Sequence, residues 1–159
     1  MPAPPVGSVP LATGQAGAAG RTGWEVRWEV LLADPRAAEH NDASAQLLVT
    51  VEGDGGAVRT LVTGDLEETG GAAVQALTAE VPVDVLKVPH HGSAHQGESL
   101  LARGAPLALV SAGRDNDHGH PAPATLERLD AAGSTVVGTV EHGDVAVGAS
   151  DTGLWWARL

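Results

Sequence analysis

The sequence contains no cysteine, no phenylalanine and no tyrosine, and it has a single methionine. Without cysteine the chain forms no disulfide and offers no thiolate to a metal, so any metal site must use histidine and carboxylate side chains. Four tryptophans are the only aromatic residues. We therefore expect a core built mainly from small aliphatic side chains.

Long apolar runs and basic residues are also scarce. No stretch of about 18 apolar residues occurs, and the N-terminus lacks the basic and apolar regions of a signal peptide, so we expect a soluble chain. The chain has twenty acidic and nine basic residues, which gives a net charge of −11. Such a balance disfavours binding to nucleic acid through a basic surface. The length of 159 residues suits one domain rather than two.

The first 23 residues are rich in proline, glycine and alanine and show no periodicity. That composition predicts a flexible leader over residues 1–23, followed by one domain over residues 24–159.

Hydrophobic periodicity from Trp24 onward predicts alternating strands and helices. Strands are expected at residues 24–32, 46–51, 57–63, 83–88, 106–111, 134–140, 144–149 and 154–159, and helices at 66–80, 96–102 and 123–132. A glycine-rich turn at residues 52–56 predicts an antiparallel hairpin, and His142-Gly143 predicts a second turn between two strands. The order predicts a mixed α/β (α+β) sheet with flanking helices.

Two predicted strands end in residues that bind metals. Thr60–Thr63 leads through Gly64 to Asp65, and Val83–Val88 leads through Pro89 to His90 and His91. Ligands gather at the carboxyl ends of strands in sheets flanked by helices. Imidazole and carboxylate groups suit Zn²⁺ or Mn²⁺, which would supply a metal-bound hydroxide and a clamp on a phosphoryl group.

Each of these residues also has a simpler interpretation. Asp65 could serve only as the N-cap of the next helix, and one of His90 and His91 could merely pack. His120 is better placed for a role, because Gly119 and Pro121 restrict it. Solvated or loop-holding roles are the alternatives for a further set of residues: His40, His95, Arg114, Asn116, His118 and His142.

Four motifs in order carry a family resemblance. They are Asn41-Asp42-Ala43-Ser44, Thr63-Gly64-Asp65-Leu66-Glu67-Glu68, the run from Asp84 to Ser93, and Asn116-Asp117-His118-Gly119-His120-Pro121. Together they resemble the C-terminal metallo-β-lactamase-like domain of ComEC-type competence proteins, the polytopic membrane proteins of bacterial DNA uptake. The resemblance covers roughly residues 24–154.

The resemblance implies an αββα sandwich with a metal site, for Zn or Mn, at one edge of the sheets. It implies that Asp65 bridges two metals, and that the histidine pair supplies a late ligand, with His90 preferred over His91. Lys87 and His120 are the further catalytic candidates. The implied substrate-binding residues are Asn41, Ser44, Ser93, Asn116 and His120. The implied activity is that of a nuclease or phosphodiesterase acting on DNA, with the membrane channel portion of full-length cell-membrane relatives as a partner.

One departure from the family pattern shapes the prediction. Metallo-β-lactamase-like hydrolases carry an early cluster such as His-x-His-x-Asp-His, whereas the first histidine here is the isolated His40. A catalytic zinc site normally has three protein ligands. We therefore predict the C-terminal half of the sandwich, N-terminally truncated, and weak or inactive alone.

Three hypotheses remain open. The chain is an inactive remnant of a nuclease domain, or a metallohydrolase completed by ligands from another chain or a second copy. In the third, it is a non-enzymatic acidic domain that binds a partner through an exposed sheet.

Overall fold

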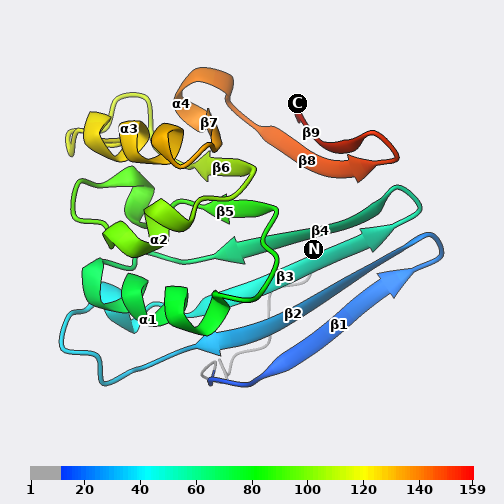
Figure 1. Ribbon diagram of the computed structural model, residues 1–159, viewed down its shortest axis with the longest axis horizontal. Coiled ribbons are helices and arrows are strands. Elements are labelled where there is room, and N and C mark those ends of the chain that lie inside the picture. The colour runs from blue at the N-terminus through cyan, green and yellow to red at the C-terminus, as the bar shows by residue number, and fades with distance from the viewer. Residues whose placement is uncertain (1–11) are drawn as a thin grey trace.

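The computed structural model describes residues 12–159, which form one large sheet, three main helices and a separate hairpin (Figure 1). The strands are β1 (Ala16–Arg21), β2 (Trp24–Leu32), β3 (Gln46–Gly53), β4 (Gly56–Val62), β5 (Val85–Lys87), β6 (Leu107–Val110), β7 (Thr135–Gly138), β8 (Val145–Ser150) and β9 (Gly153–Arg158). The α-helices are α1 (Glu68–Thr78), α2 (Glu98–Arg103), α3 (Pro123–Ala131) and α4 (Thr139–His142), and the 3-10 helices are η1 (Asn41–Ala43) and η2 (Pro89–Gly92).

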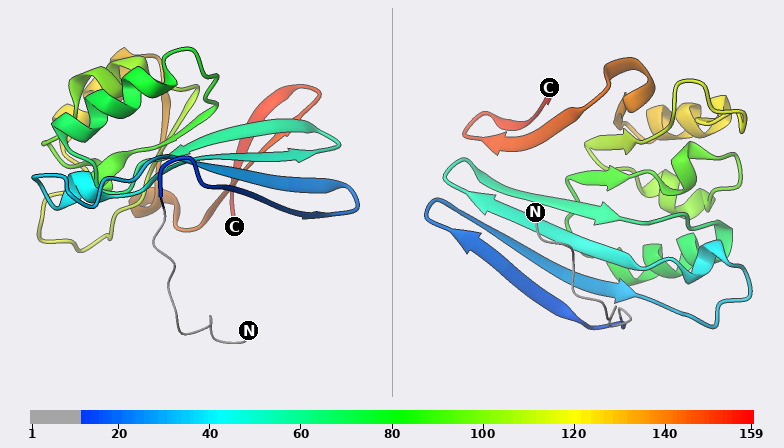
Figure 2. Two further views of the ribbon diagram at one scale, coloured as in Figure 1. Left: turned by 90° about the horizontal axis from the view of Figure 1, so that it is seen from below. Right: turned by 180° about the vertical axis from the view of Figure 1, so that it is seen from behind.

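The large sheet has seven strands in sequence order from β1 to β7. Strands β1 to β4 are antiparallel neighbours, and β4 to β7 are parallel neighbours. Helices α1, α2 and α3 make the crossovers between the parallel strands, and they all cover one face of the sheet (Figure 2). Crossovers of one hand that advance in one direction place their helices on the same face.

Two apolar clusters lie on the two faces of this sheet. Leu61 of β4 belongs to the cluster beneath the helices, whereas Val58 of the same strand belongs to a cluster with residues of β8 and β9. Side chains alternate between faces along a strand, so an odd separation places these two on opposite sides. The β8–β9 hairpin therefore covers part of the face that the helices leave open.

The predicted leader is wrong for residues 16–21, which form β1 along the edge of the sheet. Gly17 lies opposite Trp28, and a Cβ at Gly17 would come within 2.5 Å of the Trp28 ring. The small residues that indicated a linker thus allow β1 to lie close beside a large aromatic side chain. Residues 1–11 of the predicted leader lie outside the described residues.

Two further predictions need correction. The strand expected over residues 134–140 ends at Gly138 and α4 begins at Thr139, so the turn expected at His142-Gly143 lies at the end of a helix rather than between two strands. Strand β8 pairs with β9. The i, i+3 spacing of Val74 and Leu77 predicts that both face inward from α1, but Leu77 is 54% exposed, whereas Val74 is fully buried.

The predicted mixed sheet with flanking helices is confirmed. The seven-stranded sheet and its helices form one α/β layer pair across residues 12–159. Within these residues no helix combines the length and the apolar character that a membrane crossing requires.

Candidate functional site

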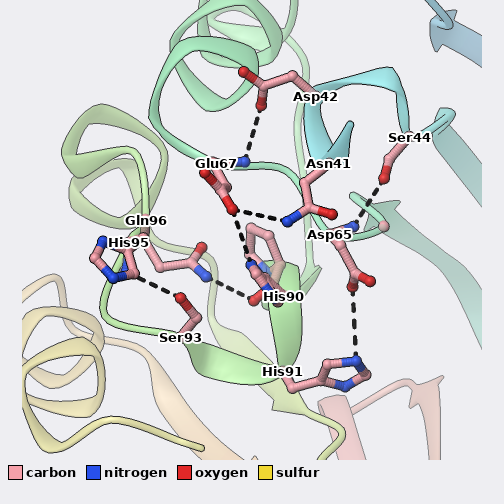
Figure 3. Close-up of polar contacts among 12 residues, drawn as sticks. Asn41, Asp42, Ser44, Asp65, Glu67, His90, His91, Ser93, His95 and Gln96 are labelled. Atoms are coloured by element: carbon pink, nitrogen blue, oxygen red, sulfur yellow. Dashed lines mark hydrogen bonds and ion pairs between the residues drawn. The ribbon is translucent and has the colours of Figure 1, made fainter. Parts of the chain in front are cut away.

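The carboxyl ends of β4 and β5 meet the start of β3 at one edge of the sheet, and the site lies there (Figure 3). The segment after β4 carries Asp65 and Glu67, and the segment after β5 carries His90 and His91. η1, which precedes β3, carries Asn41. Parallel strands end at the same edge, so their sequence-distant polar residues come together.

Asp65 and His91 form the first pair of the site. His91 Nε2 lies 3.8 Å from Asp65 Oδ1, and His91 Nδ1 lies 2.7 Å from the carbonyl oxygen of Ser111. A carbonyl oxygen only accepts hydrogen bonds, so Nδ1 carries a proton, and Nε2 is the ring nitrogen that faces the carboxylate. In the neutral tautomer Nε2 and the carboxylate are both acceptors, and a proton or a cation between them would satisfy both groups.

Lys87 and Ser44 hold Asp65 from the other side. The Lys87 ammonium donates to the Gly64 carbonyl at 2.9 Å and lies 4.0 Å from Asp65 Oδ1. The Asp65 backbone N–H donates to Ser44 Oγ at 3.1 Å. Burial lowers the pKa of the Lys87 ammonium, and the Asp65 carboxylate offsets part of that shift.

His90, which the sequence favoured as the metal ligand, points to a different partner. Its Nδ1 lies 3.5 Å from Glu67 Oε1, and the same oxygen accepts a hydrogen bond of 2.8 Å from Asn41 Nδ2. Glu67 therefore links Asn41 to His90. By its sequence position Glu67 is only an acidic residue in the first turn of the helix predicted over residues 66–80, and its place two residues after Asp65 is the one local signal of this contact.

The backbone explains why adjacent histidines point apart. His90 and His91 have φ angles of 44° and 54°, and Gly92 follows with 80°. Non-glycine residues in this left-handed region cost about 1–3 kcal/mol each and cluster at functional sites. Hydrogen bonds from the His90 N–H to the Gly64 carbonyl and from the Ser93 N–H to the His90 carbonyl hold the segment.

His120 lies on the far side of His90. The ring centroids of His90 and His120 are 5.6 Å apart, and those of His118 and His120 are 5.8 Å apart. The Nδ1 atoms of His90 and His120 are buried, and among residues 12–159 neither has a hydrogen-bond partner. Burial lowers the pKa of His120, and the rings of His90 and His118 lower it further.

Two of the predicted substrate-binding residues make hydrogen bonds within the loops. Asn116 accepts from the His120 N–H at 2.9 Å and donates to the His120 carbonyl at 2.7 Å, so it holds the loop that carries His120. Ser93 is only 1% exposed, and its hydroxyl accepts from the His95 N–H. Both side chains therefore stabilise the loops next to the site.

The alternative interpretation of Asp65 as a helix cap is wrong. The N-cap residue of α1 is Glu67, whose N–H donates to Asp42 Oδ1 at 3.0 Å. Asp42 comes from η1, so a buried carboxylate from a distant segment serves the start of the helix.

The site offers a metal ion two protein ligands, Asp65 and His91. Asp65 and His91 bring a carboxylate oxygen and an imidazole nitrogen to within 3.8 Å of one another, but across residues 12–159 no group of three or more histidine, aspartate or glutamate side chains is placed to hold an ion. The Lys87 ammonium lies beside the same carboxylate. These residues therefore do not fit the three-ligand centre of a catalytic zinc.

Comparison with known proteins relates the chain to a competence-related protein. It is 33% identical over 113 residues to ComE operon protein 3 of Bacillus subtilis (strain 168). The match covers 70% of this chain and 14% of that relative's length, so the chain corresponds to a small part of it. No family model matches the chain.

Proposed function

We propose that this chain is the C-terminal part of a metallo-β-lactamase-like hydrolase domain of the DNA-uptake type, with ancestral nuclease or phosphodiesterase activity and little or no activity alone. The observation that carries the proposal is the pair of Asp65 and His91 at the carboxyl edge of β4 and β5. Similarity to ComE operon protein 3 supports the DNA-uptake assignment.

The residues around this pair suit a phosphodiester. A divalent ion such as Zn²⁺ or Mn²⁺ would have Asp65 and His91 as its protein ligands here. Lys87 supplies a fixed positive charge next to Asp65. The carbonyl of Ser111 fixes the His91 tautomer and leaves Nε2 free to accept a proton or to bind an ion.

Weak activity follows from the number of ligands. Two protein ligands hold a divalent ion loosely, because a catalytic site normally has three. In addition, the net charge of −11 repels DNA, so binding would depend on bound ions or on a partner.

The test is cleavage of single- and double-stranded DNA by the purified chain with Mn²⁺ or Zn²⁺, compared with its Asp65→Ala variant. We expect wild-type cleavage close to that of the variant. Robust metal-dependent cleavage that Asp65→Ala abolishes would overturn inactivity in isolation. Zinc titration is the second readout, and the absence of any Asp65-dependent binding would overturn the site itself.

A second candidate is a non-enzymatic acidic domain that pairs with a second copy through its exposed sheet. Trp24 and Val51 are 41% and 43% exposed. Val51 lies opposite Val58, and thus on the face that the helices leave open. Apolar side chains exposed together favour self-association.

Sedimentation analysis separates this candidate from the first. If the sheet pairs, Val51→Glu converts a dimer to a monomer, whereas Leu77→Glu, at an exposed position on α1, leaves the dimer intact. A monomeric wild type would exclude the second candidate.

A further inference from the structure

Strand β7 is the last strand of the large sheet, at the edge opposite β1 (Figure 1). The Thr135 N–H donates to the Pro106 carbonyl, so the backbone groups of Thr135 and Val137 face β6. Backbone groups alternate in direction along a strand, so those of Val136 and Gly138 face outward. Within residues 12–159 no strand pairs with this outer side.

A groove of about 540 Å³ runs beside this free edge, on the side of α3 and α4. Its apolar lining comes from Val110, Pro121, Leu126 and Val136. The volume lies within the usual range for ligand sites, about 300–1,000 Å³. No residue of the β8–β9 hairpin lines the groove.

The charged side chains of the groove are acidic. Asp130 of α3 and Glu141 of α4 line it, with His142 beside them, and no lysine or arginine is among the described residues that line it. The Glu141 carboxylate lies over Gly138, in space that a Cβ at Gly138 would fill. A carboxylate is thereby held at the end of the edge strand.

We propose that this groove binds an extended basic segment of another polypeptide, which adds to the sheet as a strand next to β7. The outward N–H and C=O groups of Val136 and the N–H of Gly138 supply the main-chain hydrogen bonds, because the Gly138 carbonyl, at the N-cap of α4, already accepts the first bond of that helix. The apolar lining takes one set of alternate side chains, while Asp130 and Glu141 attract lysine or arginine. The net charge of −11 favours a basic partner over an acidic one. This proposal does not depend on the Asp65 pair.

The test uses a labelled hexapeptide of alternating lysine and valine, with binding to the full chain followed by fluorescence anisotropy at low salt. We expect the peptide to bind and a glutamate–valine counterpart not to bind. We expect the double variant Asp130→Asn, Glu141→Gln to weaken binding about fivefold or more, since rim charges contribute modestly. Glu127→Gln, which removes one charge from an exposed position of α3 outside the groove, should leave affinity unchanged.

Two peptides N-methylated at either the lysines or the valines test strand addition directly. Only one edge of an added strand forms hydrogen bonds to β7. The affinity of one methylated form should therefore fall about tenfold or more, and the other form should bind nearly as tightly as the parent peptide. Equal affinities for the two methylated forms would overturn the proposal. It would also be overturned if the double variant Asp130→Asn, Glu141→Gln bound the parent peptide as tightly as the wild type does. A wild-type dimer that competes with the peptide would assign the edge to a second copy instead. Asp65→Ala should retain full peptide binding, which keeps this result separate from the hydrolase test.

Discussion

His91 Nε2 lies 3.8 Å from Asp65 Oδ1, and this contact joins the ends of two neighbouring parallel strands. The adjacent ring of His90 points instead to Glu67. The two histidines of one dipeptide therefore occupy different environments and should respond differently to substitution.

Zinc binding should depend on His91 more than on His90. Replacing His91 with alanine removes one of the two groups that face each other, so we expect zinc affinity to fall about tenfold or more. His90→Ala should change it less than about threefold. Calorimetric titration of both variants measures the difference, and a larger loss in His90→Ala would assign the ligand to His90.

Glu67 should stabilise the site as a structural link. Glu67→Ala leaves Asn41 Nδ2 without its acceptor and His90 without its carboxylate, so we expect the free energy of unfolding to drop by about 1–2 kcal/mol. Urea denaturation measures this change. Glu80→Ala, at an exposed position after α1, is the control and should stay within about 0.5 kcal/mol of wild type. Equal stabilities for the two variants would contradict the link.

The two adjacent glycines of α1 should respond to alanine in opposite directions. A Cβ at Gly70 would come within 2.5 Å of Leu66 Cδ2 and 2.6 Å of Asp42 Oδ1, so Gly70→Ala displaces the carboxylate that serves the start of the helix. We expect a loss of about 1–3 kcal/mol. At Gly71 the nearest atom is 3.4 Å away, and alanine should stabilise the helix by up to about 1 kcal/mol.

Thermal denaturation of both glycine variants checks this prediction, with each serving as the control for the other. If Gly70→Ala is more stable than the wild type, η1 must shift to make room for the added methyl group.

His120 should make stability depend on pH. Its pKa in the folded protein is lower than the ordinary 6.5, so the unfolded chain binds the proton more readily. The neutral ring therefore contributes stability that is present above about pH 6.5 and is lost as the pH falls from there through the lower folded pKa. We expect His120→Gln to flatten this decline.

Urea midpoints measured between pH 5 and pH 8 test the His120 prediction. His40→Gln, which removes an exposed histidine, is the control and should keep the wild-type pH dependence. If the urea midpoint of His120→Gln depends on pH as steeply as that of the wild type, His120 is excluded as a source of the pH dependence.

Local pattern predicted most elements well. Alternating apolar and charged residues gave the strand at Trp24–Leu32 with its observed bounds, and Pro123 marked the first residue of α3. These features depend on neighbouring residues alone, because side-chain period and proline geometry act within a few positions.

The same patterns gave a wrong prediction where a residue distant in the sequence determines the local structure. Residues 16–21 have the composition of a linker, and they form a strand because β2 offers an edge and Gly17 accommodates Trp28. Asp65 has the sequence position of a helix cap, but the carboxylate of Asp42 reaches the helix start from η1.

The sequence by itself determined the mixed sheet and the presence of histidines and an aspartate at strand ends. The tertiary structure decided which histidine meets Asp65 and which meets Glu67. The physical reason is the left-handed backbone at His90 and His91, which turns the two side chains apart. That conformation is held by hydrogen bonds to segments such as Gly64 and Ser111, and no local pattern encodes them.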